Sequence, residues 1–250
     1  FQMVGLDAEY IRLRTIKSEE ELDWLRIGAA LSDAGLTALL AGTKAGLTER
    51  ELGAIVESAY IKHGGTTMIH YMGFTSMANP HIYVPPQHHS PRRVQKGDVV
   101  FCELSAYWWD YAGQVLRTFT VDADATPLYR DLYETAEAAF DAVTRVVRHG
   151  TTMQEIIDAA SVIEDKGYTV CDDLMHGFGG GYIQPILGTR SRPAGPLSDM
   201  TLEENMTVVV QPNVITRDHK TGVQVGELIH VTRTGFERLH RAKRGLFRVG

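Results

Sequence analysis

Two stretches, "GLTERELGAIVESAYIKHG" (residues 46–64) and "GTTMQEIIDAASVIEDKGY" (150–168), share the pattern that decides how the chain folds. Each begins with glycine, carries a threonine suited to capping a helix, continues with aliphatic residues at helical spacing and ends near a glycine. Strand-like segments follow, among them "VQKGDVVFCEL" (94–104) and "LEENMTVVVQP" (202–212). A period of about a hundred residues is too long for a solenoid, so we expect one unit duplicated inside one domain. Chance likeness of two amphipathic helices is the alternative.

Each half, about residues 16–124 and 125–239, also contains a longer helical stretch ahead of the shorter one. In the first half, Ser18 is suited to cap this helix and Gly42 to end it. The segments 99–104 and 111–121 are typical of strands. Helices followed by antiparallel strands, twice over, predict an α+β fold in which a curved sheet lies between two helix pairs. A cleft between the halves is the expected ligand site.

Composition limits the classes of partner. The 250 residues carry a formal net charge of −6, which argues against nucleic acid, because binding phosphates requires a basic surface. No apolar run approaches the ~18 residues of a membrane span, so we expect no membrane partner. Cys102 and Cys171 form no Cys-x-x-Cys pair, which indicates a reducing compartment, and we expect a cytoplasmic protein with both cysteines as buried small residues.

The glycine-rich stretch "MHGFGGGYIQP" (175–185) could be a phosphate cradle, a metal-ligand strand or a tight turn. A dinucleotide fingerprint needs a glycine five residues after its first one, but Tyr182 and Gln184 occupy those positions in the two frames. No Gly-Lys-Ser/Thr follows, and the next segment is not helical, so no helix N-terminus is available to hold an anion. The phosphate interpretation is therefore excluded.

Four segments in order complete the pattern: "KGDVVFCELSAYWWDYAGQVLRTF", "HGFGGG", "LEENMTVVVQPNV" and "GVQVGELIHVT". Together they resemble the catalytic domain of the creatinase, Xaa-Pro aminopeptidase and methionine aminopeptidase family, the M24-like peptidases. The resemblance runs from about Ile16 to Leu239. It implies the fold called the pita bread, in which two pseudo-symmetric halves of helices pack on a curved, mainly antiparallel sheet.

The family's site for two metal ions uses two aspartates, one histidine and two glutamates. The matching positions here are Glu103, Gln114, His176, Gln211 and Gly226. The family's second, substrate-side histidine is replaced by Ile183. Two divalent ions need several anionic oxygens to offset their repulsion, so we expect no metal cofactor at this site.

The resemblance also implies that catalysis can survive this loss, because creatinase is a metal-free member of the family. Gln114 and Gln211 can both donate and accept hydrogen bonds, which suits them to orienting a substrate. We do not expect creatine itself to be the substrate, because Leu116 and Gln211 stand where the resemblance would place catalytic glutamates.

Proton transfer needs a group that titrates near neutral pH. The family has a histidine before its Gly-Asp strand, and His81, His88 and His89 are the candidates here. We expect His81, which follows Asn-Pro, to be catalytic and His88 to contact substrate, although an adjacent histidine pair in a polar loop is commonly solvated. His176 is the other catalytic candidate; a lone strand histidine can also be a core residue.

Strand alternation places Glu103 on the same side as Phe101 and away from Cys102. We expect Glu103 to accept a proton or orient the ring of His176. Glu227 is a weaker substrate-binding candidate, because its offset of one residue from Gly226 can put it on the opposite face.

The aromatic residues 107–111 suggest core packing or a subunit contact, with Trp109 as a candidate wall for a cationic or planar substrate. Tyr182 is a further candidate substrate contact. Arg117 matches an arginine of the family and is expected to support the site structurally.

The leading hypothesis is a metal-independent hydrolase or lyase that acts on a C–N bond of a small polar metabolite. In it, His176 and a loop histidine shuttle a proton, Glu103 activates water or holds the imidazole, and the glutamines orient substrate. The second is a catalytically inactive pseudo-peptidase that binds a peptide or protein, and the third is a metal-dependent Xaa-Pro-type peptidase.

Residues 1–15 are typical of a junction after a missing N-terminal domain, and 16–250 of the catalytic domain. The resemblance also implies a homodimer.

Overall fold

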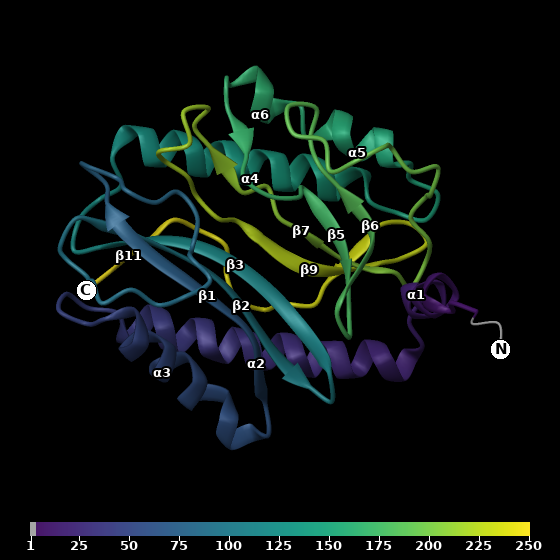
Figure 1. Ribbon diagram of the computed structural model, residues 1–250, viewed down its shortest axis with the longest axis horizontal. Helices are drawn as coiled ribbons and strands as arrows, with labels where there is room; N and C mark the ends of the chain where they lie inside the picture. Colours follow the sequence, from purple (N-terminus) through teal and green to yellow (C-terminus); the bar gives the residue numbers. More distant parts are fainter. Residues whose placement is uncertain (1–3) are drawn as a thin grey trace.

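In the computed structural model, residues 4–250 build a nine-stranded curved sheet with helices on both sides (Figure 1). The helices are α1 (Asp7–Thr15), α2 (Glu19–Gly42), α3 (Glu49–Tyr60), the short 3₁₀ turn η1 (Ile61–His63), α4 (Pro127–Val146), α5 (Met153–Ala159) and α6 (Val162–Asp165). The strands are β1 (Thr66–Ser76), β2 (Asp98–Trp108), β3 (Tyr111–Val121), β4 (Thr169–Val170), β5 (Met175–Phe178), β6 (Tyr182–Leu187), β7 (Thr207–Val210), β8 (Val214–Ile215), β9 (Gly226–Val231), β10 (Phe236–Arg238) and β11 (Phe247–Val249).

The main sheet has the order β1-β2-β3-β9-β7-β5-β6, with β10 paired to β9 and β11 to β3. Its pairs are antiparallel except for β11, which runs parallel to β3. Helices α2 and α3 cover the first half of the sheet, and α4 and α5 cover the second half (Figure 1). The contact of β3 with β9 joins the halves, as an α+β pita-bread fold requires.

The two matching stretches form matching local structure at their N-terminal ends. Thr48 caps α3 and Thr152 caps α5, each in a complete capping box with the glutamate three residues on. The glycine ahead of each cap donates its N–H to a distant carbonyl: Gly46 to Val94 at 2.8 Å and Gly150 to Leu202 at 2.7 Å. The repeat therefore includes the long-range bonds as well as the helices.

The predicted boundaries of α2 are confirmed, since Ser18 forms a capping box with Glu21 and the helix ends at Gly42. The second-half stretch 150–168 differs from the expectation of one helix, because it forms α5 and α6. The N–H of Ser161 bonds the carbonyl of Asp158 three residues back, and this tighter turn interrupts the helix.

Among residues 4–250, α2 alone is long and apolar enough to cross a membrane by length and composition. Its leucines Leu22, Leu25, Leu36 and Leu39 are buried in clusters with residues of the sheet. In this fold α2 is a core helix.

Candidate active site

Glu103 lies on the face of β2 opposite the one that packs against α2 and α3. Its neighbours Cys102 and Leu104 pack in the hydrophobic cluster that β2 shares with α2 and α3. Because side chains alternate along a strand, Glu103 projects from the other face, as predicted. We call the face that carries Glu103 the open face of the sheet, and the opposite one, which packs on α2 and α3 in the first half and on α4 in the second, the helix-covered face.

His176 and Gln211 lie on the open face of the second half. Met175 and Val210, which pair across β5 and β7, pack in the cluster that contains α4. His176 and Gln211 each follow one of these residues and therefore project from the opposite face. Gly226 pairs with Leu116 of β3. The sequence motif positions thus share one face, although they come from strands far apart in the sequence.

Glu103 and Gln114 are in direct contact on this face. Gln114 Nε2 donates a hydrogen bond of 2.5 Å to Glu103 Oε1. No cation pairs with Glu103 in residues 4–250. Burial raises the pKa of Glu103 to about 8, and the charge of Asp172 contributes further. At neutral pH this carboxyl group is therefore protonated in most molecules.

His176 is buried beside Gln211 and keeps a neutral imidazole. Its Nδ1 donates a hydrogen bond of 3.1 Å to the carbonyl of Gly177, which leaves Nε2 as the acceptor in the neutral ring. Burial lowers the pKa of His176, while the Gly177 carbonyl, Asp173, Asp172 and Gln211 act in the opposite direction. Burial thus favours the neutral form of both groups. Glu103 keeps its proton and can act as an acid, whereas the imidazole of His176 stays unprotonated at Nε2 and can act as a base.

Tyr182 covers His176. The two rings are 4.3 Å apart at an angle of 30°, and the tyrosine hydroxyl donates a hydrogen bond to Asp173. Tyr182 is half-exposed, whereas His176 is 2% exposed. The half-exposed tyrosine ring thus covers one side of the buried histidine. The substrate contact expected of Tyr182 stays a prediction.

A cavity of 440 Å³ opens onto Glu103. It is lined by Tyr71, Tyr83, Val84, Pro85, Pro86, Gln87, Glu103, Cys171, Asp172, Arg192 and Gln224. The sequence interpretation missed Asp172, Arg192 and Gln224 as wall residues. The acidic pair in "CDDLMHG", directly ahead of the histidine motif, was an available signal for Asp172, whereas nothing local marked Arg192.

The loop histidines and Trp109 lie apart from this cluster. His81 is exposed, and its Nδ1 lies 2.7 Å from the hydroxyl of Thr75. His88 is exposed and does not line the cavity of Glu103. Trp109 is 77% exposed at the turn between β2 and β3, with a positive φ of 49°. None of the three lines the cavity of Glu103, although residues 83–87 of the loop, between His81 and His88, do.

Glu227 lies on the helix-covered face. It pairs with Val115 and Val210, which both pack in helix-contacting clusters. Arg117 Nη2 donates to it at 2.7 Å, and Arg238 Nε at 2.5 Å. Burial alone would raise the pKa of Glu227, but the hydrogen bond from Arg238 and the charge of Arg117 lower it. The structure places Glu227 in a buried ion pair, away from the cavity, and supports the structural role expected of Arg117.

The residues at the motif positions do not fit a pair of divalent ions. Within residues 4–250, no group of three or more histidine, cysteine, aspartate or glutamate side chains could hold a metal ion. A Cβ at Gly226 would lie 2.6 Å from the Val210 carbonyl and 2.9 Å from Gln211 Cα, so the backbone leaves no room there for a ligand side chain. The site offers amide oxygens and one protonated carboxyl where two metals need several anions.

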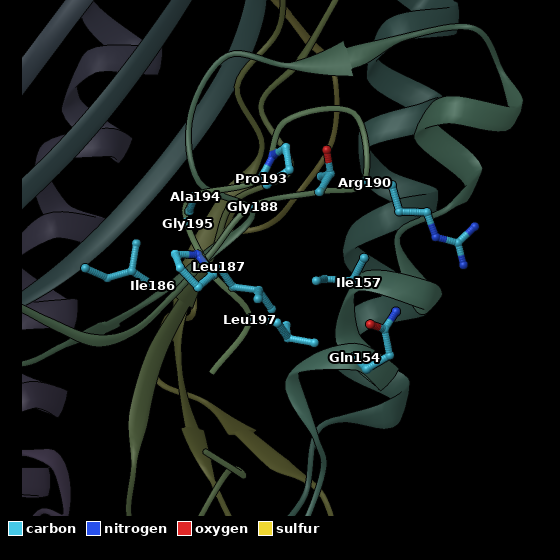
Figure 2. A pocket seen from close by; sticks show the side chains of 12 residues that line it. Gln154, Ile157, Ile186, Leu187, Gly188, Arg190, Pro193, Ala194, Gly195 and Leu197 are labelled. Atoms are coloured by element: carbon cyan, nitrogen blue, oxygen red, sulfur yellow. The ribbon is translucent and has the colours of Figure 1, made fainter. Parts of the chain in front are cut away.

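A second cavity, of 310 Å³, lies between α5 and the loop 188–197 (Figure 2). It is lined by Gln154, Ile157, Ile186, Leu187, Gly188, Thr189, Arg190, Pro193, Ala194, Gly195, Pro196 and Leu197, which include none of the site residues predicted from the sequence. Arg190 is bonded to Asp158 at 2.6 Å. We therefore assign the candidate active site to the cavity of Glu103.

Solved structures with this fold include an X-Pro aminopeptidase from Thermotoga maritima, with a TM-score of 0.84 at 22% identity over 99% of this chain and 68% of that one. A dipeptidase from Pyrococcus horikoshii gives 0.85 at 23% identity, over 100% and 68%. A methionine aminopeptidase from Rickettsia prowazekii gives 0.76 at 21% identity, over 90% and 98%. These likenesses define the fold, which is the pita-bread domain that the three structures share.

The model of metallopeptidase family M24 matches residues 23–233, so the chain belongs to that family. Similar curated proteins include an uncharacterized peptidase of Staphylococcus epidermidis, 27% identical over 90% of this chain and 62% of its own length. A Xaa-Pro dipeptidase of Pyrococcus furiosus is 26% identical over 94% of this chain and 65% of its own length. The chain thus spans a little under two thirds of these relatives.

Proposed function

We propose that this M24-family protein is a metal-independent hydrolase or lyase that acts on a C–N bond of a small polar substrate. The observation that carries the proposal is the pair formed by Glu103 and His176 on the open face. Burial keeps a proton on the carboxyl and removes it from the imidazole. Two titratable groups whose environments push their pKa values apart are suited to act as acid and base.

The two groups also share their surroundings. Asp172 influences the pKa of both, and Tyr182, which stacks on His176, is influenced by the charge of Glu103. Glu103 lines the cavity, while His176 lies behind the Tyr182 ring. A substrate in the cavity would meet the acid first, and displacement of the tyrosine would expose the base.

In hydrolysis, Nε2 of His176 takes a proton from water as the water oxygen bonds to the substrate carbon. The C–N bond then breaks, and Glu103 gives its proton to the leaving nitrogen. Transfer of the proton from His176 back to Glu103 restores the starting state. This reverses the role that the sequence suggested for Glu103, because a protonated carboxyl group donates a proton rather than activating water.

The relatives' names, peptidase and Xaa-Pro dipeptidase, support hydrolysis of a C–N bond as the type of reaction. The residues at the five motif positions do not fit two divalent ions, and this supports a reaction without the family's two metals. Against the pseudo-peptidase alternative stands the retained acid–base pair, which a pure binding protein does not need.

The test is a screen of small amides and ureas with the purified protein, in the presence and absence of a chelator, together with elemental analysis. We expect turnover that survives chelation and no stoichiometric metal. Tight binding of two metal equivalents, with activity that depends on them, would establish the metallopeptidase alternative. Peptide or protein binding without any turnover would establish the pseudo-peptidase alternative.

The proposal includes a homodimer in the cytoplasm. Light scattering of the purified protein tests the dimer, and fractionation of the producing cell tests the location.

A further inference from the structure

A further cavity, of 280 Å³, lies between α2 and the chain around β10. It is lined by Arg26, Ala30, Asp33, Glu237, Arg238, Leu239 and Arg241. None of these residues lines the cavity of Glu103. A water molecule takes about 30 Å³ in the liquid, so the space corresponds to about nine waters and is large enough for a small ligand.

The two carboxylates of this wall are already bound by the protein itself. Asp33 accepts hydrogen bonds from His240 Nδ1 at 2.8 Å and from two backbone N–H groups, the nearer being that of Arg241 at 2.6 Å. Glu237 accepts a hydrogen bond of 3.0 Å from Arg26 Nη2. The wall therefore offers few acceptors to the N–H or O–H groups of a ligand.

The arginines of the wall, in contrast, have unused donors. The guanidinium group of Arg241 makes no hydrogen bond or ion pair with any other side chain in residues 4–250, since only its backbone N–H is bonded. Arg238 directs Nε and Nη2 to Glu227, and its Nη1 has no partner in the same part of the chain. The hydrogen-bonding groups that remain for a ligand are thus mainly cationic N–H donors.

This local excess of donors contrasts with the charge of the whole chain. The formal net charge is −6, so the protein does not attract anions in general. An anion that binds here must be held by specific contacts. Guanidinium groups make such contacts, because their planar N–H pairs match the oxygens of carboxylates and phosphates.

We propose that this cavity binds the phosphate group of a small ligand between the guanidinium groups of Arg26, Arg238 and Arg241. A phosphate group carries about two negative charges and three acceptor oxygens, whereas a carboxylate carries one charge and two oxygens, so three arginines around one space favour phosphate. Ala30 and Leu239 give the same cavity apolar surface for a short organic group. The site is separate from the proposed catalytic one and does not depend on the proposed function.

The test is calorimetric titration of the intact protein with inorganic phosphate, glycerol 3-phosphate and acetate at one ionic strength. We expect the wild type to bind both phosphates at least about tenfold more tightly than acetate. Arg241→Gln should weaken phosphate binding at least about tenfold, because it removes charge-assisted hydrogen bonds but no side-chain contact within residues 4–250. Arg26→Gln is the second variant. Arg50→Gln, at an exposed position of α3, is the matched control and should bind as the wild type does.

Equal affinity of the wild type for acetate would overturn the inference. So would the absence of phosphate binding up to about 10 mM, well above a millimolar dissociation constant. Loss of binding in Arg192→Gln, at the cavity of Glu103, with normal binding in Arg241→Gln and Arg26→Gln would place the anion elsewhere and overturn it as well. Tighter binding of glycerol 3-phosphate would support a phosphate monoester as the ligand, and equal affinity of the two phosphates would support recognition of the phosphate group alone.

Discussion

Glu103 and Glu227 are buried glutamates of the same sheet, but they lie on opposite faces. On the helix-covered face, Glu227 is held by Arg117 and Arg238. On the open face, Glu103 has an amide donor, Gln114, and no cation within the described residues. The pKa of Glu227 is lowered and the pKa of Glu103 is raised to about 8.

The difference shows that burial alone does not decide what a carboxyl group does. Burial raises the pKa of both residues, and only the partners differ. With two arginines, the carboxylate stays ionised and stabilises the junction of β3, β9 and β10. Without them, it becomes a protonated group next to a cavity. The four predictions below test this contrast, from the largest expected effect to the smallest.

Removing the acid or the base on the open face should have the largest effect. Glu103→Gln and His176→Ala should each lower turnover of a responsive amide or urea by about 10²–10⁴-fold, because each removes a proton-transfer step. Initial rates with fixed substrate measure this, and Trp109→Phe at the hairpin tip is the control with near-normal rates. Normal rates in both site variants would remove these residues from the mechanism.

Removing the charge on the helix-covered face should affect folding. Glu227→Gln should lower the free energy of unfolding by about 3–5 kcal/mol, because it leaves the buried Arg117 without its counter-charge. Glu103→Gln, the matched change on the open face, should not lower it at neutral pH, because it removes a carboxyl group whose raised pKa already costs stability there. Urea unfolding of both variants measures the difference. Similar losses in the two would contradict the contrast between the faces.

Arg238 should contribute less than Glu227 itself. Its side chain is 41% exposed, whereas that of Arg117 is 1% exposed. Water screens the exposed charge, so Arg238→Gln should cost about 1 kcal/mol. The same urea titration at low and high salt checks this, since salt should reduce the loss. A cost equal to that of Glu227→Gln would mean that Arg238, not Arg117, is the main partner.

The raised pKa of Glu103 should make the stability of the wild type depend on pH. Its pKa is raised from 4.5 when unfolded to about 8 when folded, so the folded state binds more protons in between. Stability contributed by this group is fully present below pH 4.5 and is lost as pH rises through about 8. The wild type should therefore lose stability relative to Glu103→Gln across this window. Thermal melts of both proteins measure it; parallel curves would mean that the pKa of Glu103 is the same in the folded and the unfolded protein.

Much of the fold follows from local sequence patterns. The caps at Ser18, Thr48 and Thr152 and the 111–121 strand lie where the sequence predicts them, because capping and strand alternation depend on near neighbours. The site was predicted less completely. Placement of Glu103 opposite Cys102 follows from alternation, but Asp172 and Arg192 reach the cavity from a loop with no strand periodicity.

The sequence by itself determined the duplicated α+β architecture, the family and the replacement of the metal ligands at Gln114, Gln211 and Gly226. Tertiary structure alone decided that Glu227 pairs with arginines, that Glu103 keeps its proton and that Trp109 stays at an exposed tip. The physical reason is that helix caps and strand periods involve residues close in the chain. A pKa depends on which charges arrive from distant strands, and Arg238 reaches Glu227 whereas no cation reaches Glu103 in the described residues.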